Sequence, residues 1–247
     1  MGEPWPAGER QTGVEVAESM VGRLDLPDAG FHFCAGVLDA RAVRALDPVL
    51  AVIPSSAAGR RWAGAELALL LETPALDALG RAIGALLPGM AVLRTVAFKK
   101  DADANWFVPP HQDRSIPIPS DVPPPGFGNV TRKGGGWQAE APIEILAEMR
   151  NCRIFVDAAT EDDGPLEVIP GSHRRGRISQ AGIAAVTREG SWHALTGAPG
   201  DLAVLSPLLL HRSRKAARPS GRRVLQIECI PTAVAVRRAL DAHPLAV

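Results

Sequence analysis

The sequence contains no tyrosine and only three cysteines in 247 residues. The absence of tyrosine, together with abundant alanine, glycine and proline, indicates a GC-rich coding background and excludes no function. Cys34, Cys152 and Cys229 are an odd number and do not have the spacing of a metal site. We therefore expect no disulfide framework, and we expect buried thiols in a reducing, cytoplasmic compartment.

The sequence also lacks net charge, a long apolar run and a secretory signal. Lysine and arginine together number 27, as do aspartate and glutamate, so no global field attracts nucleic acid or an anionic membrane. The apolar runs at residues 67–71 and 204–210 are far shorter than a bilayer span. The first residues show no basic stretch followed by an apolar run. We expect a small-molecule partner, with no nucleic acid and no membrane, and the oligomeric state stays open.

The length suits one β-sandwich or barrel domain, which we expect over residues 1–247. Residues 1–90 are expected to be mainly helical. Asp39 is placed to cap one helix, and Thr73-Pro74 begins another that ends before Pro88-Gly89. These helices form either a separate module or a layer packed outside one domain. The second is favoured, because no linker rich in glycine, serine and proline follows them.

From residue 91 to residue 231 the pattern changes to short apolar runs bounded by turn residues, which predicts strands. Several short strands with long connections and little helix favour an antiparallel sandwich or barrel. The strands are expected at residues 91–99, 108–115, 152–158, 166–169, 201–205, 208–213 and 222–230.

One connection, residues 116–138, is unusually long and rich in proline and glycine. Structureless segments of this length are uncommon in compact domains unless they are lids, binding loops or disordered inserts. Phe127 and Trp137 provide apolar anchors that disorder would not favour, so an active-site loop is the preferred interpretation over a disordered insert.

His111, Asp113 and His211 are candidate metal ligands. A His-x-Asp triplet by itself is weak evidence, because it arises by chance. In a strand, however, residues i and i+2 point to the same face, so His111 and Asp113 could reach one ion. His211 lies among leucines in a second expected strand, where a buried imidazole needs a partner. A hydrogen-bonded core histidine is the simpler explanation for His211 alone, but the three residues together favour a facial iron site.

The last expected strand has two different faces. Leu225, Ile227 and Cys229 make an apolar face, whereas Arg222 shares the opposite face with several polar residues. A polar face inside a small barrel indicates a lined cavity. A guanidinium there suits a carboxylate ligand, and Ser213, in phase with His211, could add a hydroxyl. The alternative is that Arg222 belongs to a basic surface cluster.

With these residues, the chain resembles the phytanoyl-CoA dioxygenase family of Fe(II)/2-oxoglutarate-dependent oxygenases. The resemblance covers about residues 91–231 and departs at Pro110, where many relatives have an aromatic residue before the metal histidine. The matching segments are His111-Gln112-Asp113, residues 163–173 (DGPLEVIPGSH), Pro199-Gly200-Asp201-Leu202, and His211-Arg212-Ser213 with Arg222.

The resemblance implies a mainly β fold, the double-stranded β-helix or jelly roll of the cupins, with the N-terminal helices packed outside. It implies that His111, Asp113 and His211 bind Fe(II), and that Arg222, helped by Ser213, holds the distal carboxylate of 2-oxoglutarate. His173, which follows a Pro-Gly-Ser turn, is interpreted as structural.

The resemblance implies a dioxygenase that oxidises a C–H bond of a small molecule and converts 2-oxoglutarate and O2 to succinate and CO2. Hydroxylation is the favoured outcome. Relatives act in secondary metabolism, among other pathways. Asp113 opposes a halogenase, in which a small residue replaces the carboxylate. Desaturation, epimerisation or cyclisation at the same iron, a cupin-type metal-binding isomerase, and a non-catalytic ligand-binding protein remain alternatives. Trp137, Gln138 and Trp106 are weaker candidates for contact with substrate.

Overall fold

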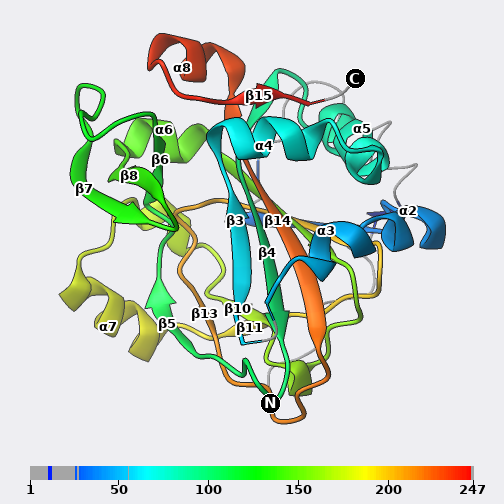
Figure 1. Cartoon of the computed structure of the whole chain (residues 1–247). Coiled ribbons are helices and arrows are strands. Elements are labelled where there is room, and N and C mark those ends of the chain that lie inside the picture. The colour runs from blue at the N-terminus through cyan, green and yellow to red at the C-terminus, as the bar shows by residue number, and fades with distance from the viewer. Residues whose placement is uncertain (1–10, 13–25, 27, 55, 246–247) are drawn as a thin grey trace.

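The computed structural model describes residues 11–12, 26, 28–54 and 56–245 (Figure 1). Its helices are α2 (Ala40–Ala45), α3 (Asp47–Ala51), α4 (Gly64–Leu71), α5 (Asp77–Leu86), α6 (Ile143–Glu148), α7 (Gln180–Glu189) and α8 (Thr232–Arg237). Its strands are β1 (Gln11–Thr12), β2 (Phe31–Ala35), β3 (Gly59–Trp62), β4 (Met90–Lys100), β5 (Val108–His111), β6 (Ser115–Ile118), β7 (Gly128–Lys133), β8 (Gly136–Glu140), β9 (Arg150–Phe155), β10 (Leu166–Val168), β11 (His193–Leu195), β12 (Leu202–Leu205), β13 (His211–Ser213), β14 (Arg222–Pro231) and β15 (His243–Pro244).

A large, almost entirely antiparallel sheet runs through the molecule, with β14 and β4 as its longest strands (Figure 1). The strand order is β1-β2-β12-β9-β14-β4-β15, and β3 also pairs with β4. Only β1 and β2 pair in parallel among the described strands. Alternate residues of each strand point to opposite faces, so the sheet has two surfaces of different chemistry.

The outer face of this sheet is covered by helices α2 to α5. Leu225, Ile227 and Cys229 of β14 belong to a buried cluster that also contains Leu67 of α4 and Ile83 of α5. All three cysteines are free and buried in this cluster, as expected from the sequence. Burying each large apolar side chain contributes about 1.5–3 kcal/mol, so this contact fixes the helices against the sheet. The prediction of N-terminal helices packed outside the β core is confirmed.

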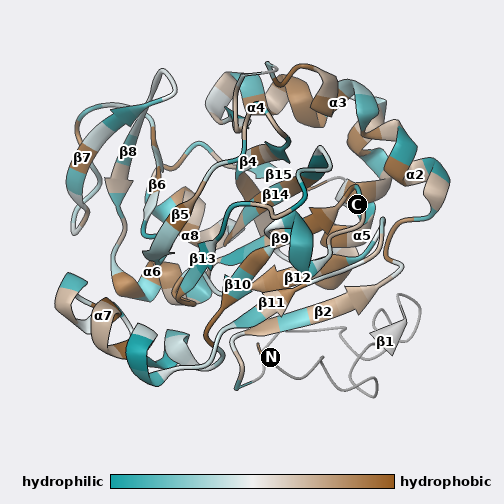
Figure 2. Ribbon diagram, turned by 90° about the horizontal axis from the view of Figure 1, so that it is seen from below, coloured by the Kyte–Doolittle hydropathy of each residue, from teal (hydrophilic) through white to brown (hydrophobic). Residues whose placement is uncertain are grey.

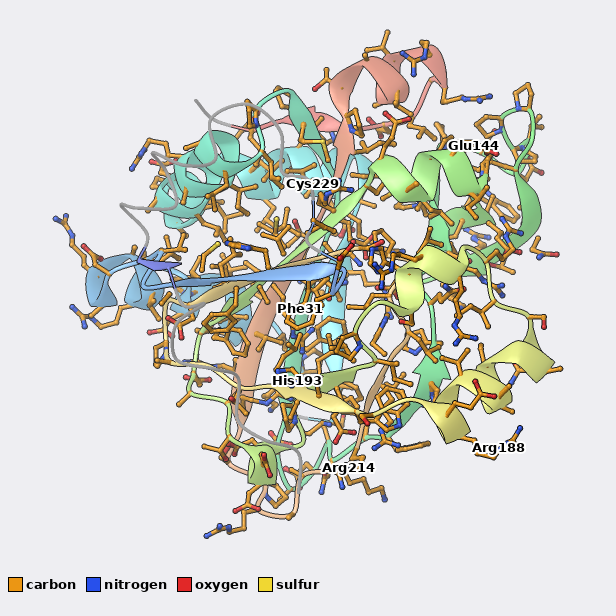
Figure 3. All side chains as sticks on the ribbon, turned by 180° about the vertical axis from the view of Figure 1, so that it is seen from behind. Phe31, Glu144, Arg188, His193, Arg214 and Cys229 are labelled. Atoms are coloured by element: carbon orange, nitrogen blue, oxygen red, sulfur yellow. The ribbon has the colours of Figure 1, made fainter. Side chains whose placement is uncertain are left out.

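A smaller sheet faces the other side, with the order β11-β10-β13-β5. Figure 2, seen from below, shows β10, β11 and β13 in front of the large sheet. Phe33 of β2, Phe155 of β9 and Val168 of β10 share one buried cluster between the two sheets. Phe31 and His193, labelled in Figure 3, stack across the same space with ring centroids 5.9 Å apart. Two antiparallel sheets packed in this way form the expected jelly roll.

Residues 116–138 are not structureless, which corrects the expectation of a long loop. They contribute β6, β7 and β8, which form a separate three-stranded antiparallel sheet in the order β6-β8-β7. Ile116, Ile118 and Ala139 bury one side of this sheet in a cluster with α6 and α8. The period-two alternation of burial in β6 was concealed by its proline, which sits at an outward position.

Residues 1–90 also contain more strand than expected. β2 and β3 both pair within the large sheet, so the N-terminal part is not purely helical. The Asp39 cap is confirmed: its Oδ1 accepts from Ala42 N at 2.7 Å. The helix it starts ends at Ala45, and a second one, with Pro48 near its beginning, follows directly. None of the described helices is long and apolar enough to cross a membrane.

Candidate functional site

Three side chains that could hold a metal ion converge where β5 and β13 meet. The ligand atoms of His111, Asp113 and His211 all lie within 4.8 Å of one another. The Asp113 carboxylate has one oxygen 3.6 Å from His111 Nε2 and the other 3.7 Å from His211 Nε2. Such distances place all three within reach of one ion with bonds of about 2.0–2.2 Å. Two histidines and one carboxylate are the donor set of non-haem Fe(II) sites with open positions.

Strand pairing brings the two histidines together. His211 lies opposite His111 in the β13–β5 ladder, and its other neighbour is Val168 of β10. The two imidazole rings have centroids 4.2 Å apart. β5 ends at His111, so Asp113 lies in the turn before β6 rather than in a strand. The parity argument for Asp113 was therefore wrong. Its backbone N–H donates to Pro207 O at 2.9 Å, and this bond directs the carboxylate to the site.

Each imidazole is oriented through its second nitrogen. The Nδ1 atoms of His111 and His211 lie 2.9 Å from the carbonyl oxygens of Pro109 and Leu209, respectively. An Nδ1–H that donates to a carbonyl leaves the Nε2 lone pair available for a metal, as is usual for metal-bound histidine.

Asn151 of β9 orients the carboxylate. Its Nδ2 donates to Asp113 Oδ2 at 2.9 Å. Burial alone would raise the pKa of the Asp113 carboxyl, but His211, His111 and Arg94 outweigh it and lower this pKa below its ordinary value. Burial also lowers the pKa of His211 to about 4, against the opposing effect of Asp113. At neutral pH the site therefore offers a carboxylate and a neutral His211, the forms that bind a metal.

A second group of polar side chains surrounds the carbonyl oxygen of Gly164, beside Ser213, which follows His211 by two residues on β13. Lys100 Nζ, Ser213 Oγ and Arg222 Nη2 donate to this oxygen at 3.0, 3.1 and 3.2 Å. Lys100 Nζ also donates to Ser213 Oγ at 2.7 Å. Gly164 has φ +58°, and a Cβ there would lie 2.5 Å from Arg214 O, so only glycine fits the turn.

Among the described residues, Arg222 is the member of this polar group that is short of acceptors. Lys100 Nζ has a further acceptor in Arg214 O at 2.5 Å. Arg222 is buried, it shares Gly164 O with two other donors, and its Nε has no hydrogen-bond partner in the part of the chain that the structure describes. Burial, together with the charges of Arg222 and Arg153, lowers the pKa of Lys100 to about 7. A buried guanidinium with too few acceptors is costly, so this polar group is suited to an anion.

The sequence model of the family described as phytanoyl-CoA dioxygenase (PhyH) matches residues 68–224, more than half of the chain. The chain belongs to the phytanoyl-CoA dioxygenase family. The match contains all three residues of the metal triad and both Ser213 and Arg222. No curated protein matches the sequence.

Solved structures similar to this phytanoyl-CoA dioxygenase family member support the fold. AviO1 from Streptomyces viridochromogenes Tue57 is 23% identical, with a TM-score of 0.51 over 82% of this chain and 90% of that one. HygX from Streptomyces hygroscopicus, solved with nickel and 2-oxoglutarate, is 16% identical, with a TM-score of 0.55 over 83% and 84%. The epimerase SnoN from nogalamycin biosynthesis, solved with Fe3+, α-ketoglutarate and nogalamycin RO, is 15% identical, with a TM-score of 0.57 over 87% and 83%.

Within this family member, the structure brings together two sets of residues named from the sequence. His111, Asp113 and His211 form the triad, and Ser213 lies beside Arg222 at Gly164 O. Arg222 is buried, which opposes the interpretation as a surface cluster. His173 packs against Gly30, and its structural role stays a prediction.

The weaker substrate candidates lie in three different settings. Trp106 packs beside the polar group around Gly164 O, with Lys100 Nζ 4.2 Å from its ring centre, and its Nε1 donates to Lys99 O. Trp137 is half-buried against the apolar cluster beneath β6 and β8, with the Arg132 guanidinium over its ring. Gln138 is buried in β8. Their contact with substrate stays a prediction.

Sequence reasoning missed four further residues at this site. Asn151 and Arg153 lie on the inner face of β9, and Lys100 is opposite Arg222 across β4 and β14. Gln112, between two metal ligands, bonds the backbones of Gly176, Leu208 and Ile178. A signal was present for the strand residues, since each is a polar side chain at an inward position of a central strand.

Proposed function

We propose that this protein is an Fe(II)/2-oxoglutarate-dependent dioxygenase. It oxidises a C–H bond of a small molecule, with hydroxylation as the first expected outcome, and converts 2-oxoglutarate and O2 to succinate and CO2. The observation that carries the proposal is that a facial triad and a buried cationic group lie side by side on the same strands. His211 of the triad is two residues from Ser213 on β13, and Ser213 shares Gly164 O with the buried Arg222.

The residues fit both absent groups. Fe(II) is matched by the donor set of His111, Asp113 and His211, with both imidazoles presenting Nε2. The distal carboxylate of 2-oxoglutarate is matched by Arg222, whose buried Nε lacks an acceptor, and by the hydroxyl of Ser213 beside it. A guanidinium binds a carboxylate through two parallel hydrogen bonds, so an anion here would relieve the excess of donors.

The chain's own residues provide orientation and a dry environment. When bound, the iron supplies oxygen activation, and the cofactors carry the difficult chemistry. Asn151 fixes the carboxylate of Asp113, and the backbone carbonyls of Pro109 and Leu209 fix the imidazoles. Phe155 and Leu209, both fully buried between the sheets, exclude water from the space behind the site.

The type of oxidation and the substrate belong to this proposal. Structurally similar proteins are described as an epimerase and a carbocyclase of nogalamycin biosynthesis, and HygX is solved with hygromycin B bound. We therefore propose a natural-product intermediate as substrate, with epimerisation, desaturation or cyclisation as alternatives to hydroxylation. The β6-β8-β7 sheet begins directly after Asp113, and we propose that it covers the bound substrate.

The test is an anaerobic titration of the Fe(II)-loaded protein with 2-oxoglutarate, followed by visible spectroscopy. We expect the weak charge-transfer band of the chelate in the wild type and its loss at the same concentration in Arg222→Ala. Absence of a band in the wild type, or an unchanged band in Arg222→Ala, would refute the assignment. Either result would favour a cupin-type isomerase or a non-catalytic binding protein. Succinate release with candidate natural products then identifies the substrate.

A further inference from the structure

Arg153 of β9 is a buried guanidinium that forms no ion pair among the described residues. It is 4% exposed, and its one hydrogen bond among the described residues goes from Nη1 to the neutral Gln226 Oε1 at 3.3 Å. Its guanidinium carbon lies 5.5 Å from the centre of the Phe98 ring. Burial, and next the charge of Arg222, lower its pKa to about 9, which confirms an unfavourable setting for a cation. Five N–H donors thus have one acceptor.

The strand register places Arg153 between the two halves of the site. Asn151, which bonds the Asp113 carboxylate, precedes Arg153 by two residues and so shares its face of β9. Arg153 lies opposite Gln226 of β14, and Arg222 is four residues further along that strand. Strand residues are about 3.3 Å apart along the chain, so Arg153 lies two residues beyond Asn151, the partner of Asp113, in the direction of Arg222.

The charges along this path favour a dianion. Arg94 is neutralised by Glu228, with a shortest N–O distance of 2.8 Å. Arg153 and Arg222 remain as buried cations, Lys100 adds a partial positive charge at neutral pH, and Asp113 belongs to the triad. A divalent metal adds positive charge. Arg222 would bind one carboxylate of such a dianion. The second buried cation, Arg153, lies nearer the triad and would bind the other carboxylate there.

We propose that Arg153 binds the carboxylate at C1 of 2-oxoglutarate, the end that lies at the iron, while Arg222 binds the opposite end. This assignment rests on the proposed function. A 2-oxo acid that chelates a metal through its keto group and one carboxylate oxygen leaves the other carboxylate oxygen free. That oxygen accepts from Arg153, whose position along β9 is next to the metal ligands. Arg153 is therefore a binding residue for the co-substrate, specific to its 2-oxo acid end.

The test uses calorimetric titration of the full-length protein loaded with Ni(II), which binds 2-oxo acids without turnover. Two ligands are compared: 2-oxoglutarate, and 2-oxovalerate, which lacks the distal carboxylate. In Arg153→Met we expect the Kd of both ligands to rise by a similar factor, about tenfold or more, since a charge-assisted hydrogen bond is lost from their common end. In Arg222→Met we expect the Kd of 2-oxoglutarate to rise and that of 2-oxovalerate to stay unchanged.

Arg153→Lys keeps the charge without the planar fork, so it should raise both Kd values by a smaller common factor. It also serves as the informative variant if Arg153→Met does not fold, which metal stoichiometry and circular dichroism will reveal. No binding of 2-oxoglutarate by the wild type would refute the proposed function itself. If the wild type binds 2-oxoglutarate, two results would overturn the role of Arg153 alone. The first is unchanged Kd values in Arg153→Met and Arg153→Lys. The second is a weaker affinity in these variants for 2-oxoglutarate but not for 2-oxovalerate. Unchanged Kd values together with lost turnover would also overturn this role, and would indicate that Arg153 binds an acidic group of the substrate instead.

Discussion

At the residue scale, the site depends on side chains that hold other side chains. The metal ligands take their orientation from backbone carbonyls and from Asn151, and the carboxylate end takes its shape from one left-handed glycine. Such supporting contacts set metal affinity nearly as strongly as the ligands themselves. Two predictions test them.

Replacing Asn151 by alanine removes the donor to Asp113 Oδ2. We expect metal affinity to fall about 10- to 100-fold, because the carboxylate loses its fixed orientation. Competition with a metal-binding dye under anaerobic conditions measures the change. Asn105→Ala is the matched control: its side chain bonds the Ala216 backbone, so metal affinity should be retained. Equal affinity in Asn151→Ala and the wild type would contradict the role assigned to Asn151.

Lys100 should make the stability of the metal-free protein depend on pH. Its pKa is about 7 in the folded state, against 10.5 for the ordinary side chain. Below pH 7 both states are protonated, so the cost of the buried charge is fully present. Between pH 7 and 10 the unfolded chain binds the extra proton, and stability rises with pH.

The measurement is urea unfolding of the wild type and Lys100→Met at pH 7 and pH 9. The difference in free energy of unfolding, wild type minus variant, should increase by about 2 kcal/mol across this range. Other titrating groups cancel in this difference. The same pH dependence in both proteins would show that Lys100 is charged when buried, contrary to its lowered pKa.

At the scale of elements, the site is a junction of strand ends and turns. β5 and β13 bring the histidines together, and the segment after β5 turns to present Asp113 before it enters β6. Gln112 anchors this turn, since its side chain bonds Gly176 O, Leu208 O and Ile178 N at 2.6–2.9 Å. One side chain thus connects the metal-binding turn to two other loops.

Gln112→Ala should lower the free energy of unfolding by about 2–3 kcal/mol, because it leaves buried backbone groups without partners. Gln112→Glu should cost more, since a carboxylate cannot donate to the two carbonyls. Chemical denaturation of the metal-free proteins measures both. Gln180→Ala, at the exposed start of α7, is the matched control and should change stability by less than about 0.5 kcal/mol. Equal stabilities for Gln112→Ala and this control would refute the anchoring role.

At the scale of the whole molecule, the metal site joins segments that are far apart in the chain. His111 and His211 lie a hundred positions apart in sequence and directly opposite each other in the fold. A ligand that binds only the folded state stabilises it according to its concentration relative to Kd. Metal removal should therefore be visible in global stability.

We expect Ni(II) at a hundredfold excess over its Kd to stabilise the protein by about 2.7 kcal/mol. The rise in Tm should be reversed by EDTA and absent in His211→Ala. His243→Ala, whose imidazole bonds Gly64 O in another part of the fold, should keep the full effect. A metal-dependent rise of the same size in His211→Ala would place the metal elsewhere.

The sequence alone determined the β architecture, the helical layer and the ligand set. Six of the seven strand predictions were correct in position to within a few residues, and the second strand ended earlier, before β6. They succeeded because apolar periodicity reports which face of a strand is buried. Among the strands that were missed, β2 and β3 pair with strands distant in sequence. β7 and β8 form a hairpin inside the segment rich in proline and glycine, and β7 is largely exposed.

The tertiary structure decided what surrounds each ligand. Spacing in the sequence identified His111, Asp113, His211, Ser213 and Arg222, but it could not reveal that Asp113 reaches the site from a turn. It also could not place Arg153 between the metal and Arg222, or Lys100 opposite Arg222. Chemistry of this kind depends on contacts between strands distant in the chain. Local periodicity records only whether a residue faces inward, and not which residues it meets there.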